Sequence, residues 1–587
     1  MSIQRLTDEI LSYIFLFASQ SDENRYDSST IMPLTISHTA SRWRRVAQST
    51  GTLWTNVVIT NLSCASIQRI HTWLFRSKKY PLRILLDFRD DVWDWEGRHQ
   101  FTAQHMKILL PLLTPHVERW KSFDLITDTW EPIHTFLSMT RKVSSAPMLE
   151  YLMLSRCNAY FARRGQSFQP ADLKVHIPLF GGVSLPKLRE ISFVGVHVNW
   201  AQSSLCNLRK LEFKFHAYEV MPSLQEFTKI LSLCPNLDTL SILGWGPRLD
   251  NYNPEVGFSA SDDDSDKLTP SLSELKSTIV LENLVNFSYG FVDVPYGLHL
   301  LSLFRLPSLR RFNLEDVSTS VDSHGLGPGD ASPILDWLAS SDSSNLRASV
   351  DATDSIDDLG QPAKLAGIAE RTLSSSSSPA IDVINGNRGC TLPLLNVERL
   401  GLSGLSSNES TFFQFFRAFS SVKKISLSDM DSNVLSTLSP QNPSPEPVEG
   451  NELSVEALPM RERISVEDSC ERNRRSSFSL VTSRSRVAPC PQLVDIVCRV
   501  ADPSKLSALV QLLVRRARLD SGVQRVQSVR IEATPPLVYD DEDELGDYDT
   551  SFEDSFSSGG LSEADRQGFE GVILSNGYVG DYVDSGC

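Results

Sequence analysis

The sequence has no apolar run long enough to cross a membrane. Across its 587 residues, no stretch approaches the ~18 consecutive apolar residues that a membrane-spanning helix needs. Met1 is followed at once by a segment with helical apolar spacing, where a signal peptide would have a continuous apolar core. We therefore expect an intracellular protein, in the cytoplasm, the nucleus or both, that has no membrane partner.

Basic residues are scarce relative to acidic ones. The chain carries 56 Lys and Arg against 72 Asp and Glu, which gives a formal net charge of -16 at pH 7. An excess of negative charge opposes non-specific attraction to nucleic acid and to anionic lipid. We expect neither nucleic acid nor a membrane surface among the partners.

Motifs that carry catalysis or bind cofactors are also missing. The nine cysteines are scattered and never spaced Cys-x-x-Cys, a distribution typical of reduced thiols. The chain has no glycine-rich phosphate-binding loop, no His-Glu-x-x-His and no Gly-x-Ser-x-Gly. These absences predict a non-catalytic protein with no catalytic residues, no metal and no cofactor.

His99 and His105, close to Asp94 and Glu96, are the residues that most resemble a metal-ligand set. Their spacing matches no metal motif, and the sequence fixes no further ligand beside them. We therefore interpret this stretch as a solvated polar segment.

The first sixty residues carry the clearest local signals. Apolar residues at positions 6, 10, 11, 14, 15 and 17 recur at three- and four-residue steps, which predicts an amphipathic helix. Thr7 can cap that helix, and Asp8 and Glu9 then lie in its first turn. A second block, from Pro33 to Ile59, has similar spacing and contains Trp43-Arg44 and Leu53-Trp54.

Together the two blocks resemble the F-box, in the form common among F-box proteins of higher fungi, the basidiomycete type. That family has a Leu-Pro-x-Glu-Ile-Leu helix, a variable linker, a helix with Trp-Arg before a small residue, and a closing Leu-Trp. The positions that match are Leu6, Glu9, Ile10, Leu11, Ile14, Phe15, Trp43, Arg44, Leu53 and Trp54. Thr7 stands where the family usually has Pro, and a polar insert at 19–30 lengthens the linker. A pair of amphipathic helices within a larger helical domain is the alternative.

The resemblance implies a substrate-recognition subunit of an Skp–cullin–F-box ubiquitin ligase. Its partners would be an Skp-type adaptor, through it a cullin, and a protein target whose identity the sequence does not reveal. The residues expected to contact the adaptor, or to form the packing behind that contact, are Leu6, Ile10, Leu11, Ile14, Phe15, Pro33, Trp43, Leu53 and Trp54. An F-box scaffold acting outside any ligase and an unrecognised α/β enzyme are the alternatives.

A repeated pattern follows from about residue 149 to residue 427. Eight units read apolar-x-x-apolar-x-apolar, for example Leu188 to Phe193 and Leu208 to Phe213. Several steps between units are 20 to 29 residues, the period of leucine-rich repeats. We predict an α/β (α+β) fold in which F-box helices at 1–60 precede an irregular leucine-rich-repeat-like solenoid at 61–533. A mixed α/β domain whose strands share a common buried pattern is the alternative.

Four stretches have too few apolar residues for a core. We predict disordered insertions near 253–267, 318–388 and 436–486, and a disordered acidic tail at 534–587, because such compositions cannot offset the entropy cost of ordering. Between the last insertion and the tail, apolar spacing predicts a strand near 493–496, a helix at 504–519 and a strand at 526–531. This unit could cap the solenoid.

Within each repeat strand, the residue between the last two apolar positions should point away from the core. In leucine-rich-repeat proteins this row lines the concave face, so the resemblance implies that it contacts the target. The expected target-binding residues are Ser192, Glu212, Lys214, Ser241, Ser288, Asn313, Glu315 and Ser426. The alternative is that these are simply solvated strand residues.

Overall fold

The fold is mixed helix and strand, built on one large parallel sheet. The computed structural model describes residues 3–19, 25–90, 99–156, 162–258, 279–318, 329–340, 394–439, 489–500, 503–517, 523–533 and 579–584. Within these ranges no helix combines the length and the apolar character needed to cross a bilayer. Most of the predicted insertions at 253–267, 318–388 and 436–486, and most of the predicted acidic tail at 534–587, lie outside these ranges.

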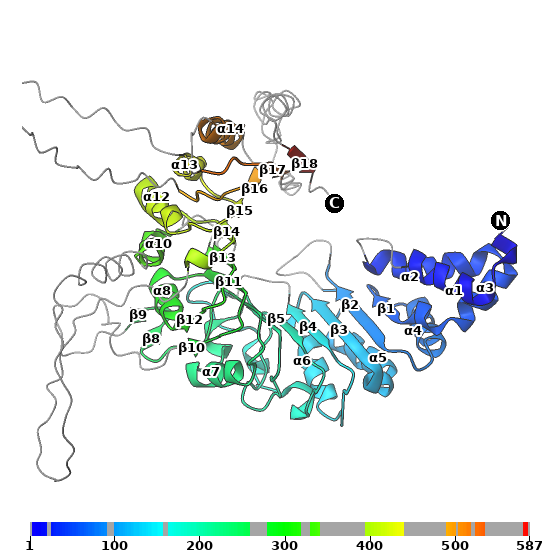
Figure 1. The fold of residues 1–587 in the computed structure, drawn as a ribbon. Helices are drawn as coiled ribbons and strands as arrows, with labels where there is room; N and C mark the ends of the chain where they lie inside the picture. Colours follow the sequence, from blue (N-terminus) through cyan, green and yellow to red (C-terminus); the bar gives the residue numbers. More distant parts are fainter. Residues whose placement is uncertain are drawn as a thin grey trace, which may run out of the picture.

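The chain begins with a group of short helices (Figure 1). They are α1 (Asp8–Ala18), α2 (Arg25–Thr39), α3 (Ser41–Ser49) and the 3-10 helix η2 (Gly51–Trp54). Asp8 and Glu9 lie in the first turn of α1, as predicted, where carboxylates favour the positive end of the helix dipole. The N-cap of α1 is Thr7, although its side chain makes no capping hydrogen bond.

A fourteen-stranded sheet follows, and each of its strands pairs in parallel with the next strand of the sheet along the chain. The strands are β1 (Asn56–Ile59), β2 (Leu82–Phe88), β3 (Trp120–Thr127), β4 (Tyr151–Arg156), β5 (Glu190–Val194), β6 (Lys210–Lys214), β7 (Thr239–Leu243), β11 (Asn286–Phe291), β13 (Arg311–Asp316), β14 (Arg399–Ser403), β15 (Lys424–Ser428), β16 (Asp495–Val500), β17 (Ser528–Ala533) and β18 (Val579–Asp584). All eight sequence units coincide with strands, β4 to β7, β11 and β13 to β15.

Helices connect the strands and lie on the outer side of the arc that the sheet describes (Figure 1). They are α4 (Cys64–Arg76), α5 (Ala103–Leu113), α6 (Trp130–Thr140), α7 (Leu224–Ser232), α8 (Val294–Ser302), α10 (Ser332–Ala339), α12 (Glu409–Arg417), α13 (Ser432–Thr437) and α14 (Pro503–Ala517). Alternate strand residues such as Leu400, Leu402 and Ile425 are buried. This period of two follows from the pleat, which sends successive side chains to opposite faces.

The predicted boundary at residue 60 falls directly after the first strand of the sheet. The strand β1 ends at Ile59 and already pairs with β2. One continuous hydrophobic cluster runs from Leu11 to Ile531. The helical segment and the sheet therefore share one hydrophobic core, in which Trp54 packs against Trp73 of the helix α4 between β1 and β2.

Parts of the predicted disordered segments have regular structure. The strands β8 (Tyr252–Asn253) and β9 (Gly257–Phe258) form a small hairpin at the start of the 253–267 stretch. The helix α10 lies inside 318–388, α13 ends within the start of 436–486, and β18 forms within the tail 534–587. The composition of the surrounding residues obscured these elements, although α10 buries the apolar residues Ile334, Leu335 and Leu338 at helical spacing. The predicted closing unit is confirmed as β16, α14 and β17.

Candidate functional site: an exposed apolar helix face and the inner face of the sheet

The single apolar stripe predicted for α1 divides into an inner and an outer face. Leu11 and Phe15 are buried, and the Phe15 ring lies 5.2 Å from that of Trp43 in α3. Leu16 is partly buried and packs against the core, whereas four other apolar side chains of the helix are exposed. They are Ile10 (46%), Tyr13 (70%), Ile14 (42%) and Phe17 (77%).

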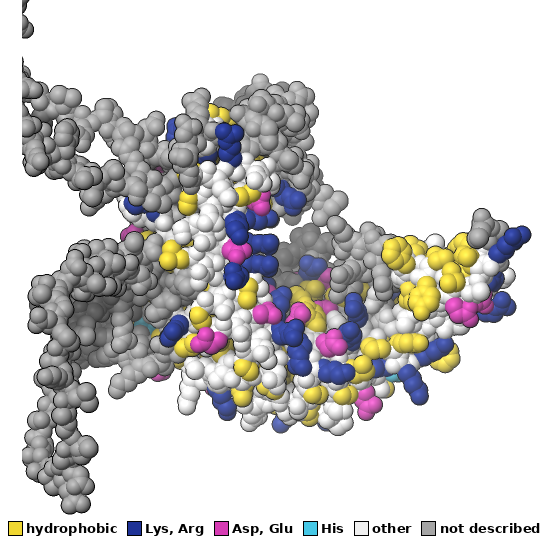
Figure 2. Space-filling view, viewed as in Figure 1, with side chains coloured by type: hydrophobic (Ala, Val, Ile, Leu, Met, Phe, Trp, Pro, Cys, Tyr) yellow, Lys and Arg dark blue, Asp and Glu magenta, His cyan; other side chains and the backbone are white. Residues whose placement is uncertain are grey.

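These four residues form what we call the outer face of α1. They lie at positions i, i+3, i+4 and i+7, so they make one continuous strip along the helix. Ile31 (62% exposed) and Leu34 (38% exposed) add apolar surface on α2. Figure 2 shows hydrophobic side chains gathered over this N-terminal helical part. Contiguous exposed apolar surface of this kind usually marks a site where another protein docks.

A polar contact fixes the start of α1 against α3. The Arg42 guanidinium donates to the Asp8 carboxylate (Nη2 to Oδ1, 2.7 Å) and to the Leu6 carbonyl (2.5 Å). Asp8 lies in the first turn of α1, so this contact sets the rotation of the helix. The outer face is thus presented from a helix that is held at its start by Arg42 and along its inner side by the core.

The nine residues expected to contact the adaptor differ in how far they are exposed. Ile10 and Ile14 are exposed and can contact a partner. Five are buried and act in packing, namely Leu11, Phe15, Pro33, Leu53 and Trp54, whereas Leu6 and Trp43 are partly buried. Sequence reasoning missed Tyr13, Phe17, Ile31 and Leu34 as contact candidates, although the helical spacing that relates Tyr13 and Phe17 to Ile10 could have found the first two.

The expected row along the sheet exists as a line of paired residues. Ser192 pairs with Glu212, Glu212 with Ser241, and Ser241 with Ser288. The row continues to Asn313 and, across Gly401, to Ser426.

The expectation that the whole row is exposed is wrong for three members. Ser192, Glu212 and Ser241 are buried, whereas Asn313 is exposed and Ser288 and Ser426 are partly buried. Side chains on the inner side of an arc lie close together and cover one another. Glu212 illustrates this, because Lys210 and Lys214 reach it from the positions two residues before and after.

Glu212 is held as a buried carboxylate between two lysines. Its Oε1 lies 3.3 Å from the Lys210 ammonium and 3.2 Å from that of Lys214. Burial opposes its negative charge, but Lys214 and Lys210 outweigh that effect and lower the pKa of Glu212. At the far end of β13, burial and the nearby Asp429 raise the pKa of Glu315. Glu212 therefore belongs to the structure of the inner face, which makes it a poor choice for testing target contacts.

We predict that Glu212→Lys lowers the free energy of unfolding by about 2 to 3 kcal/mol, because three ammonium groups would then meet on a mostly buried surface. Urea denaturation of the full chain would measure the change. Glu190→Lys on β5 is the matched control, since Glu190 is exposed and pairs across the sheet with Lys210. Equal losses for the two variants would contradict the assignment of Glu212 as a structural ion-paired residue.

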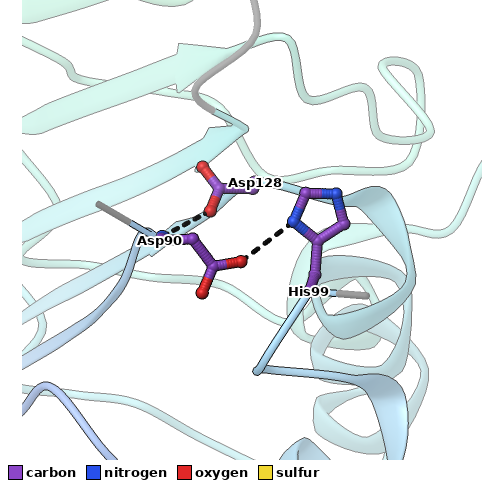
Figure 3. Close-up of side chains that lie close together, drawn as sticks. All are labelled: Asp90, His99 and Asp128. Atoms are coloured by element: carbon purple, nitrogen blue, oxygen red, sulfur yellow. Dashed lines mark hydrogen bonds and ion pairs between the residues drawn. The ribbon is translucent and has the colours of Figure 1, made fainter. Parts of the chain in front are cut away.

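A separate polar cluster lies at the carboxyl ends of β2 and β3 (Figure 3). His99 Nδ1 lies 3.0 Å from Asp90 Oδ2, and the backbone N–H of Asp90 donates to Asp128 Oδ2 at 2.7 Å. Burial raises the pKa of Asp128, and the charge of Asp90 adds a smaller effect in the same direction. The hydrogen bond from the Asp90 N–H acts in the opposite direction but does not outweigh them. The prediction of a solvated segment is therefore wrong for His99. His105 instead accepts a hydrogen bond from the Thr102 N–H at 3.1 Å, at the start of α5.

Two comparisons with known proteins found no match. No protein-family model matches the chain, and no curated protein matches its sequence.

Proposed function

We propose that this chain is the substrate-recognition subunit of an Skp–cullin–F-box ubiquitin ligase. The observation that carries the proposal is the outer face of α1, a strip of four exposed apolar side chains in the segment whose sequence resembles an F-box. An Skp-type adaptor covering this strip would remove apolar surface from water, which is the main favourable term in most protein association.

The sheet and its outer helices would hold the target. We interpret them as an irregular leucine-rich-repeat-like solenoid, because each strand pairs with the next strand of the sheet along the chain and helices lie along one side. The accessible part of the inner row, which includes Ser288, Asn313 and Ser426, would face the target. The action of the chain is then to raise the effective concentration of the target beside the ligase, with no covalent step of its own.

We predict that Ile10→Asp combined with Ile14→Asp abolishes recovery of the adaptor and of the cullin in affinity purification of the full chain. The charges would lie in the centre of the proposed interface, where an unpaired carboxylate is costly to bury. Both positions are 42 to 46% exposed in the free chain. The free energy of unfolding should therefore change by less than about 1 kcal/mol.

The matched control is Ile108→Asp on α5, because Ile108 is 45% exposed and lies outside the N-terminal helices. It should leave recovery of both partners unchanged. Equal recovery from the double variant and the parent chain would contradict the proposal. Adaptor recovered without any cullin would instead favour a scaffold that acts outside the ligase.

A further inference from the structure

Three side chains that can bind a metal converge at one edge of the sheet. Asp90 follows β2, Asp128 follows β3, and His99 precedes α5. Their donor atoms all lie within 4.8 Å of one another. Figure 3 shows the three side chains close together on these separate segments, with Asp90 linked to both Asp128 and His99.

The cluster is largely withdrawn from water. The side chains of Asp90 and His99 are each 16% exposed, and Asp128 is 7% exposed as a residue. Two carboxylates in such a position repel each other unless a cation is present. The adjacent basic residue Arg89 pairs with Asp87, through contacts of 2.9 and 2.6 Å. An ion held among the three residues would offset this repulsion.

The donor set is also held in place before any ion binds. The Asp90 N–H fixes one oxygen of Asp128, in the way that outer hydrogen bonds orient metal ligands. Asp128 directly follows β3, and Asp90 lies two residues after the end of β2. Three protein ligands leave a fourth position for water, the arrangement found in open zinc sites, and an imidazole beside carboxylates suits zinc better than calcium or magnesium.

We propose that Asp90, His99 and Asp128 form a binding site for one divalent transition-metal ion of the zinc class. The ion ties the ends of β2 and β3 to the segment that starts α5. It replaces the direct contact between His99 and Asp90 by two bonds to the metal. The site is separate from the outer face of α1. Metal binding can therefore be tested independently of ligase assembly.

Titration of the chelator-treated full chain with Co²⁺ tests the site, because bound Co²⁺ absorbs visible light according to its ligands. We expect one equivalent to bind, to be displaced by Zn²⁺, and to lose affinity about tenfold or more in His99→Gln and in Asp128→Asn. His71→Gln is the control, since His71 is exposed on α4 and should leave binding unchanged. Zn²⁺ should raise the thermal unfolding midpoint of the parent chain and of His71→Gln only.

Three results would overturn the proposal. Strong near-ultraviolet thiolate absorption at one equivalent would place the ion on cysteines, five of which lie among the described residues. Equal affinity in the parent and in folded His99→Gln would exclude the imidazole as a ligand. No saturable binding at all would leave His99 and Asp90 as an ordinary hydrogen-bonded pair.

Discussion

Trp54→Ala is expected to lower the free energy of unfolding by about 3 to 5 kcal/mol, the range for removing a large buried aromatic side chain. Trp54 is fully buried, and its ring meets that of Trp73 edge to face at 4.7 Å. The Arg76 guanidinium lies 4.4 Å from its ring centre, and its indole N–H donates to the Ala47 carbonyl at 2.8 Å. One side chain therefore joins α3, η2 and α4, so its loss should loosen the helical segment from the sheet.

Chemical denaturation of the full chain measures this effect, and Phe75→Ala on α4 is the matched control. Phe75 is 84% exposed, so its truncation should change the free energy of unfolding by less than about 1 kcal/mol. Similar losses in the two variants would show that Trp54 does not carry the junction. We also expect deletion of residues 1–60 to disturb the sheet as well as to remove the helical segment. The reason is that the deletion removes both Trp54 and the strand β1.

Acidification from pH 6.5 to pH 5 is expected to lower the free energy of unfolding by about 2 kcal/mol or more. His197 and His216 are both buried, and neither ring nitrogen of His197 has a hydrogen-bond partner among the described residues. Burial lowers the pKa of His197 to about 2, helped by nearby His176, His216, His134 and Lys174. Burial also lowers the pKa of His216 to about 4, against the hydrogen bond from its Nε2–H to Val196.

The sign follows from which state binds the proton. Both histidines are neutral in the fold, whereas in the unfolded chain they take up protons as the pH falls through ~6.5. Above that pH, protonation of these histidines does not reduce the free energy of unfolding. Below it, each residue lowers the free energy of unfolding by up to ~1.4 kcal/mol per pH unit until the pKa of the folded state is reached. Buried carboxylates with a raised pKa, Asp128 and Asp316, act in the opposite sense and reduce the net slope.

His197→Phe tests this account, because phenylalanine can keep the stacking on Trp130, whose ring centre lies 4.6 Å away. The variant should match or exceed the parent's stability at pH 8, since it removes two unpartnered nitrogens. Its stability should also fall less steeply below pH 6.5. His71→Gln, at an exposed position, should keep the parent's slope. A slope in His197→Phe as steep as the parent's would contradict the buried neutral state of His197.

Local apolar periodicity predicted much of the fold, because the spacing of apolar residues depends directly on which side chains are buried. The units around Leu188 and Leu208 became β5 and β6, and the closing strand, helix and strand were confirmed. The connection of the N-terminal helices to the sheet could not be predicted, because the pairing of Trp54 with Trp73 arises only after both helices pack. The helix α10 was missed because residues on either side of it have the composition of an insertion.

The candidate site was predicted in outline, but not in the roles of its residues. Spacing placed Ile10, Leu11, Ile14 and Phe15 on one stripe, yet only neighbouring helices decide which of them face inward. The line from Ser192 to Ser426 was predicted from the period of two, but the covering of Glu212 by two lysines depends on the closeness of side chains inside the arc. The cluster of Asp90, His99 and Asp128 brings together residues from the ends of two strands, with Asp128 38 positions after Asp90, so no local pattern could reveal it.

Direct titration of the purified full chain with a purified Skp-type adaptor in a calorimeter tests the central claim most directly. We predict a one-to-one complex with a negative heat-capacity change, as expected when the apolar outer face of α1 is buried. The complex should be lost in Ile10→Asp with Ile14→Asp and kept in Ile108→Asp. Absence of binding by the folded parent chain, or equal binding by the double variant, would contradict the account.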